Sequence, residues 1–261
     1  MNRNDIPNLR QAFRPRDLIT ALGLLTRLPL PDTAFSAPLT RPAAHAAWAY
    51  PLVGLVVAGL GVGVASLLAS LGLSPPVQAL FVLLVGALVT GAMHEDGLAD
   101  CTDGFWGGWT RERRLEIMKD SQIGTYGVIA LVLSLVLRWQ LITALIEGAG
   151  LANALITAAI VSRAAMVWVM VRLPPARDNG LSRHTGTPPH AALGGALLIA
   201  GLAMLYSGAA LTLVVVCALL TFAIGMLARA KIGGQTGDVL GATQQVVEIG
   251  ALLTLSTLAP F

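Results

Sequence analysis

The sequence predicts an all-α, polytopic integral membrane protein with about seven transmembrane helices. Only 12% of its 261 residues are charged and 55% are hydrophobic, whereas about 25% of the residues in a soluble domain are charged. No Asp, Glu, Lys or Arg occurs in residues 42–93 or 184–228, and each block is long enough for two crossings of about 20 residues. An unusually apolar soluble helical bundle is disfavoured, because so short a chain can hardly bury several apolar runs of about 18 residues.

Turn-forming residues divide the apolar runs into separate crossings. The expected spans are residues 46–69, 76–93, 128–146, 152–171, 191–206, 209–227 and 246–258. Residues 18–30 are also apolar, but they include Arg27 and end beside prolines, which favours an interfacial or re-entrant helix. We therefore expect one membrane domain over residues 1–261, beginning with a cytoplasmic or interfacial segment, residues 1–41.

Basic residues are confined to every second loop. The N-terminal segment and the loops after the second, fourth and sixth spans contain Arg3, Arg10, Arg14, Arg16, Arg27, Arg41, Arg111, Arg113, Arg114, Lys119, Arg172, Arg177, Arg183, Arg229 and Lys231. The loops near residues 73, 148 and 207 contain none. Because short basic loops remain in the cytoplasm, we expect the N-terminus and all the polar loops on that side.

Two further arginines, Arg138 and Arg163, fall inside expected spans. A charge buried in a membrane is costly and indicates a functional role or a paired partner. We expect Arg138 to extend toward the far membrane surface. Arg163 has two open interpretations, a role in the site or an ion pair with a carboxylate, for which Glu248 is the nearest candidate.

The acidic residues cluster directly after the second expected span. Asp96, Asp100 and Asp103 are spaced so that they share one helical face if that span continues past Met93. Three carboxylates on one face repel each other unless a cation lies between them, and oxygen ligands suit Mg²⁺ or Mn²⁺ better than Zn²⁺. A solvated acidic loop is the alternative, but such loops usually mix Lys, Ser and Glu. We expect a metal site here, within a catalytic loop at residues 94–127.

Two Gly-rich segments precede later spans, at residues 121–127 and 233–238. Neither matches the phosphate-loop pattern, yet both can offer backbone N–H groups to an anion at a helix start. The candidate phosphate-binding residues are Gly124, Gly127, Gly234, Gln235, Thr236 and Gly237. Between the segments, residues 111–120 predict a short amphipathic interfacial helix whose basic residues bind either phosphate or anionic lipid. Together these features indicate Mg²⁺-dependent transfer at a phosphorus centre.

The acidic motif from His94 to Gly104 resembles that of the cobalamin synthase family, the adenosylcobinamide-GDP ribazoletransferases. Other segments that resemble the family in the same order are residues 24–31, 50–54, 113–127, 162–163 and 233–241. Glu95 departs from the pattern, since the family tolerates an apolar residue there. The resemblance implies a bacterial inner-membrane enzyme that joins α-ribazole, or its 5′-phosphate, to adenosylcobinamide-GDP and releases GMP.

The resemblance also implies roles for individual residues. Mg²⁺ held by Asp96, Asp100 and Asp103 would bridge the diphosphate, and His94 would bind substrate. The catalytic candidates are Asp120 and Asp238, as further ligands or as the general base, and Arg163 and Lys231, which would offset phosphate charge. We expect contact with membrane lipid, no nucleic-acid partner and a possible homo-oligomer.

Two other functions remain as alternatives. CDP-alcohol phosphotransferases also use a membrane-edge Asp-Gly motif, but their pattern has Ala-Arg where this chain has Leu98 and Ala99. A cation transporter with an acidic mouth would place charges near the bilayer midplane, often in paired repeats, whereas these acidic residues cluster at one edge.

Overall fold

The computed structural model describes residues 13–30 and 41–258, and within them the chain is helical with one isolated β-bridge, between Pro175 and Gln235. In chain order the helices are α2 (Pro15–Leu25), the 3-10 helix η2 (Ala43–Ala49), α3 (Tyr50–Ser70), α4 (Pro75–Thr90), α5 (Met93–Gly107), α6 (Arg111–Ile117), α7 (Thr125–Glu147), α8 (Leu151–Arg172), α9 (Leu181–Thr185), α10 (His190–Tyr206), α11 (Ala210–Ile232) and α12 (Gly237–Leu258). The all-α prediction is confirmed for this part of the chain.

A helix lies at each of the seven expected spans, but seven crossings are not confirmed. Within the described ranges, five helical segments are long and apolar enough to cross a membrane: η2 continued by α3, and α7, α8, α11 and α12. Helices α4 and α5 are long and apolar enough to cross only when they are counted together, and they are bent by 87° relative to each other. Counting that pair as one span gives at most six spans. Helix α10 is a shorter apolar helix. Helix α2 has 11 residues and is too short to cross, as expected for an interfacial or re-entrant segment.

Helix α12 begins nine residues before the start of the expected span, so the prediction of its start was wrong. The expected span began only after the polar residues Thr243, Gln244 and Gln245, yet all three side chains are buried inside the bundle. Their polar groups bond to other buried groups, which removes the usual penalty for burying them. Gly237 and Asp238 therefore lie in the first turn of a helix, not in a loop before one.

Helices α8 and α12 form the centre of the bundle. In the most apolar 18-residue stretch of each helix, 83% of α8 and 72% of α12 are buried inside the protein, compared with 22% of α11. Small residues allow the close packing. A Cβ on Gly54 of α3, for example, would overlap the backbone of Ala159 on α8. The outer helices expose leucines such as Leu133, Leu202 and Leu219, the arrangement expected for lipid-facing surfaces.

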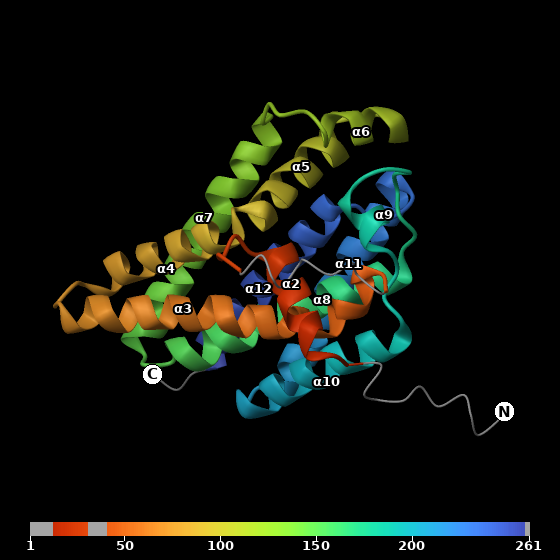
Figure 1. Cartoon of the computed structure of the whole chain (residues 1–261). Coiled ribbons are helices and arrows are strands. Elements are labelled where there is room, and N and C mark those ends of the chain that lie inside the picture. The colour runs from red at the N-terminus through yellow and green to blue at the C-terminus, as the bar shows by residue number, and fades with distance from the viewer. Residues whose placement is uncertain (1–12, 31–40, 259–261) are drawn as a thin grey trace, which may run out of the picture.

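The loops separate into two groups at opposite ends of the bundle. Residues 148–150 and 207–209, which contain no charges, line one depression together with Leu258 at the end of α12. The basic loops contact one another at the other end, where α6 bonds to the segment after α8 and to the last turn of α11. Figure 1 shows α6 and α9 far from the α3–α4 turn. The structure thus groups the basic loops as expected, and the side of the membrane they face stays a prediction.

Candidate active site

A sharp bend between α4 and α5 sets the direction of the acidic motif. Gly91 and Ala92 both have positive φ, 67° and 55°, and glycine tolerates this left-handed backbone at little cost. The 87° change in direction means that α5 is not a straight extension of the second span, so that part of the prediction was wrong. The helical spacing of the motif is confirmed, since residues 93–107 form one helix. With four acidic residues, α5 is best placed outside the membrane-spanning segments.

Two glycines allow α5 and α12 to cross in backbone contact. A Cβ on Gly97 would lie 2.7 Å from the carbonyl oxygen of Asp238 and 3.0 Å from its Cα. A Cβ on Gly241 would lie 3.1 Å from a carbonyl oxygen in the first turn of α5. Because neither glycine has a side chain, Asp96 and Asp100 on α5 come close to Asp238 in the first turn of α12. The crossing therefore joins two acidic segments that are far apart in the sequence.

The charges in this acidic cluster, defined as Asp96, Asp100 and Asp238, act on one another. Burial, followed by the nearby carboxylates of Asp96 and Asp238, raises the pKa of Asp100 to about 7, while the Arg177 guanidinium opposes the shift. A carboxyl whose pKa is raised in this way is destabilised when ionised. A cation between the carboxylates would relieve the repulsion, so the residues present fit a divalent metal ion.

The cluster does not form a closed metal cage. Among the described residues, no group of three or more His, Cys, Asp or Glu side chains is arranged to hold a metal ion. Mg²⁺ commonly binds through one or two carboxylates together with water and substrate phosphate oxygens. The open arrangement on α5 and α12 is compatible with that mode, and the metal site stays a prediction.

Asp103 faces α7, away from the α12 crossing. Its Oδ2 accepts a hydrogen bond from Gly124 N at 2.7 Å and its Oδ1 accepts one from Gly127 N at 2.8 Å. The carboxylate thus satisfies two N–H groups at the start of α7, where a helix has no internal acceptors. Both positions need glycine, because a Cβ on either would overlap the carboxylate. Gly124 and Gly127, predicted to bind phosphate, here bind Asp103.

Substituting Asp103 should separate a capping role from a metal role. If it caps α7, Asp103→Asn lowers the free energy of unfolding by about 1–3 kcal/mol, because a buried amide N–H loses its acceptor. Thermal unfolding of purified protein in chelator measures this. Asp120→Asn is the control, since the exposed Asp120 only accepts a bond from Gln122 N in its own turn. An unchanged melting temperature with weakened Mn²⁺ binding would instead identify Asp103 as a metal ligand.

A cavity of about 210 Å³ lies against the acidic cluster, and we call it the polar cavity. Asp96 and Asp238 line it together with Arg177, Asn179 and Arg183. The Arg177 guanidinium lies 3.3 Å from Asp238 Oδ2, and within the described chain its buried Nε has no hydrogen-bond partner. Carboxylates and guanidinium groups that line the same cavity can together hold a metal-bound phosphate.

Sequence reasoning missed Arg177, Asn179 and Arg183 as site residues. Their only signal was the positive charge of the loop after α8, which was used for orientation. The loop reaches the site because residues 174–176 pair with Gln235, through Ala176 N to Gln235 O and Gln235 N to Pro174 O, each 2.8 Å. That backbone pairing fixes two distant loops side by side, which no local pattern indicates.

The second Gly-rich segment is partly structural and partly exposed to the cavity. Gly234 packs so closely on Pro174 that a Cβ would overlap its carbonyl oxygen. Gln235, Thr236 and Gly237 do line the polar cavity, as expected for binding residues. The Thr236 hydroxyl lies 3.1 Å from Asp238 Oδ2 and also accepts a bond from Val239 N, so it organises the first turn of α12.

Helix α6 is held by its arginines against the end of α11. Arg111 donates to the carbonyl oxygens of Ile232 and Ala176, at 2.9 and 2.7 Å, and Arg114 donates to that of Lys231 at 3.0 Å. The last carbonyl groups of a helix have no internal donors, so the arginines satisfy them. These two arginines bond to other segments of the chain, whereas the exposed Arg113 pairs with Glu116 within α6.

Three predicted catalytic residues lie outside the walls of the polar cavity. Asp120 is exposed between α6 and α7. The ammonium group of Lys231 lies 5.6 Å from the centre of the Trp106 ring. Arg163 is buried within the bundle, in the group of charges described next.

Four buried charges connect α5, α7, α8 and α12, and we call them the ion cluster: Glu95, Arg138, Arg163 and Glu248. Both terminal nitrogens of Arg138 lie 3.2 Å from Glu95 Oε1. Glu248 lies 3.8 Å from Arg138 and 3.8 Å from Arg163. Gln245 Nε2 donates to Glu95 Oε1 at 3.3 Å. The two positive and two negative side chains balance in a region from which water is largely excluded.

The ion cluster decides both open questions about the intramembrane arginines. The prediction that Arg138 extends to the far surface was wrong, because its side chain is only 5% exposed and pairs with Glu95. Of the two open interpretations of Arg163, the structure supports the ion pair with Glu248, at 3.8 Å. Glu95, to which no role was given, turns out to anchor the start of α5 to α7.

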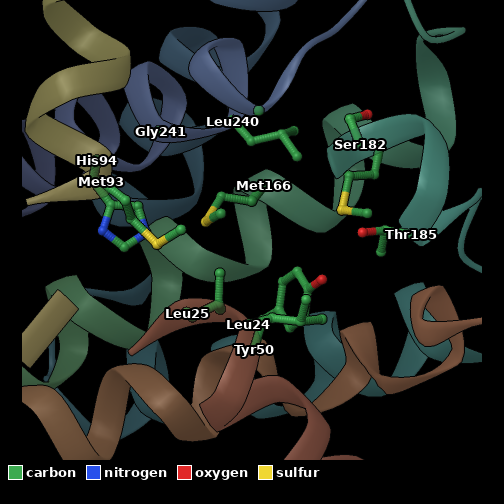
Figure 2. A pocket seen from close by; sticks show the side chains of 12 residues that line it. Leu24, Leu25, Tyr50, Met93, His94, Met166, Ser182, Thr185, Leu240 and Gly241 are labelled. Carbon is green, nitrogen blue, oxygen red and sulfur yellow. The ribbon is translucent and has the colours of Figure 1, made fainter. Parts of the chain in front are cut away.

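A second, smaller cavity of about 60 Å³ lies beside His94, and we call it the apolar cavity. The His94 side chain is buried, and its Nε2 has no hydrogen-bond partner in the described chain. Figure 2 shows His94 and Met93 at one edge of this cavity and Ser182 and Thr185 at the other.

Comparison with known proteins gives consistent matches over nearly the whole chain. The family described as cobalamin-5-phosphate synthase, CobS, matches residues 17–256. A relative from Bradyrhizobium diazoefficiens is 44% identical over 91% of this chain and 92% of its own length, and one from Mesorhizobium japonicum is 41% identical over 96% and 97%. Both are named adenosylcobinamide-GDP ribazoletransferase. No solved structure is significantly similar to the chain.

Proposed function

The chain belongs to the cobalamin-5-phosphate synthase family, and we propose that its acidic cluster joins α-ribazole, or its 5′-phosphate, to adenosylcobinamide-GDP with release of GMP. The family membership and the names of the relatives support the substrates, and they make the protein a transferase. One structural observation supports the place of the reaction. Carboxylates from α5 and α12 converge on the wall of a cavity that also contains Arg177 and Arg183.

The residues around the polar cavity suit transfer at a diphosphate. Asp96, Asp100 and Asp238 would hold Mg²⁺, which supplies charge neutralisation for the diphosphate and the departing GMP. The ribose 3′-hydroxyl oxygen forms the new bond to the cobinamide-side phosphorus, and the bond from that phosphorus to the oxygen of GMP breaks. In this proposal Asp238 would also take the hydroxyl proton, and Arg177 would bind a phosphate oxygen; their position in the wall of the polar cavity, 3.3 Å apart, supports these roles.

We place the polar cavity on the cytoplasmic side of the bacterial inner membrane. The grouping of the basic loops at the same end of the bundle as the acidic cluster supports this orientation. Nucleotide substrates are available on that side. Accessibility of single cysteines introduced near residue 109 and near residue 148 to an impermeant thiol reagent in intact cells tests it, with labelling expected only at residue 148.

The direct test is GMP release by purified protein supplied with adenosylcobinamide-GDP and α-ribazole, with Mg²⁺ or with chelator. We expect release that depends on both substrates and on the metal ion. Turnover that continues fully in chelator would exclude the metal role. If the protein instead released CMP from a CDP-alcohol, the CDP-alcohol phosphotransferase alternative would replace this proposal.

Substitution of the glycine at the helix crossing should impair this reaction. In Gly97→Ala the new methyl group meets the Asp238 backbone at 2.7 Å, so α5 must move away from α12. Misplacement of reacting groups by about 1 Å can reduce turnover on the order of 100-fold. Gly59→Ala on α3 is the matched control, because a Cβ there meets nothing within 4 Å. Equal GMP release by the two variants would contradict the importance of the crossing.

A further inference from the structure

We propose that the apolar cavity binds the aromatic base of α-ribazole, while the polar cavity beside it holds the ribose and its reacting hydroxyl. This inference rests on the proposed function and adds the part of the site that selects the nucleoside. The two cavities share Met93, Ser182 and Gly237 in their walls. A nucleoside can therefore occupy both, with the base on one side of these residues and the sugar on the other.

The walls of the apolar cavity suit a flat, mostly hydrophobic ring. Leu25, Met166 and Leu240 line it from α2, α8 and α12, and Figure 2 shows them around the same space. None of the described residues that line it is Asp, Glu, Lys or Arg. Burying an aromatic ring against such a surface is favourable, and methionine sulfur makes additional favourable contacts with aromatic rings.

Few polar groups reach this cavity, and their number fits benzimidazole better than guanine. A benzimidazole nucleoside has a single ring nitrogen left to accept a hydrogen bond. His94 Nε2 and the Tyr50 hydroxyl are candidates to donate it. Guanine has several donors and acceptors around its edge, and most would be left unpaired here, which costs binding free energy for each group. The guanine of adenosylcobinamide-GDP therefore belongs elsewhere.

The apolar cavity must enlarge when the base binds. Its volume of about 60 Å³ is less than the roughly 150 Å³ of an apolar cavity that holds benzene. Met93, Met166 and Met170 form part of the wall, and the unbranched methionine side chain can change conformation at low cost. Ligand binding would then displace methionine side chains, with the helices in place.

Filling the cavity with a rigid side chain tests the proposal. Met166→Trp should raise the Kd for α-ribazole about 30-fold or more, since the base loses its burial. It should leave the Kd for adenosylcobinamide-GDP within about threefold, a change of less than 1 kcal/mol. The conservative Met166→Leu should keep both affinities. Met204→Trp, at a buried methionine of α10 outside the cavity wall, is the matched control. Benzimidazole fluorescence on detergent-purified protein reports the binding.

The outcomes separate this inference from the proposed function. If the wild type releases GMP but Met166→Trp binds α-ribazole normally, the cavity assignment is overturned and the function stands. If Met166→Trp instead weakens the binding of adenosylcobinamide-GDP, the cavity holds guanine. Binding of α-ribazole without GMP release would overturn the function alone. Should Met166→Trp fail to fold, photolabelling of the wild type with an azido-benzimidazole riboside decides, with labels expected on residues 166–170 or 182–185 and labels elsewhere contradicting the proposal.

Discussion

Asp100→Asn should reduce GMP release on the order of 100-fold or more without destabilising the protein. The large loss is expected because electrostatic stabilisation of the transferring phosphoryl group is the main contribution such a site makes. The carboxylates of Asp96 and Asp238 lie close enough to Asp100 to raise its pKa, so removing its charge should leave the cluster unable to hold a cation tightly. Glu116→Gln, at an exposed carboxylate on α6, should retain full activity.

We expect the same substitution to leave the stability of the folded protein unchanged or to increase it. The pKa of Asp100 is raised to about 7, above its ordinary value, mainly by burial and by the two neighbouring carboxylates. A carboxyl with a raised pKa destabilises the folded protein increasingly as the pH rises from its ordinary value to about 7. At pH 8 in chelator, Asp100→Asn should therefore melt at an equal or higher temperature than the wild type. Lost activity together with a lower melting temperature would point to a structural role instead.

Glu248→Leu should strongly destabilise the folded protein. Glu248 is the only carboxylate of the ion cluster that contacts both Arg138 and Arg163, and removing it leaves Arg163 without an ionic partner. Leaving a buried charge without its partner typically lowers the free energy of unfolding by about 3–5 kcal/mol. We expect little properly folded protein after extraction into detergent, measured by size-exclusion chromatography and thermal unfolding.

A conservative change and a surface change serve as controls for that result. Glu248→Gln keeps the polar contact with Gln244 and should lie between the wild type and Glu248→Leu. Arg172→Leu removes an exposed guanidinium near the end of α8 and should change stability little. A Glu248→Leu protein as stable as the wild type would mean that the ion cluster contributes no net stability.

The sequence predicted where the helices lie, but it did not predict how they cross one another. Each long apolar run does form a helix, because membrane helices need about 20 apolar residues whatever their neighbours, but seven crossings are not confirmed. The start of α12 was missed because Gln244 and Gln245 are polar, and their buried partners come from other helices. The bend at Gly91 was missed for a similar reason, since a left-handed residue pair has no periodic signature.

The candidate site shows the same division. Asp96, Asp100 and Asp238 could be selected from their residue types and positions near expected helix ends. Their convergence depends on Gly97, and local spacing gives no indication that this glycine faces α12. The role of Asp103 as a partner of two backbone N–H groups, and the arrival of Arg177 beside Asp238, depend on tertiary contacts alone.

Binding of Mn²⁺ to the purified protein, followed by electron paramagnetic resonance, tests the central claim most directly. The claim is that carboxylates on two crossing helices, α5 and α12, hold one divalent cation. We predict that the wild type binds Mn²⁺ and that Asp100→Asn and Asp238→Asn each weaken binding about tenfold or more, the equivalent of at least about 1.4 kcal/mol, while Glu116→Gln has no effect. Equal Mn²⁺ binding by the wild type and both Asp variants would contradict the claim.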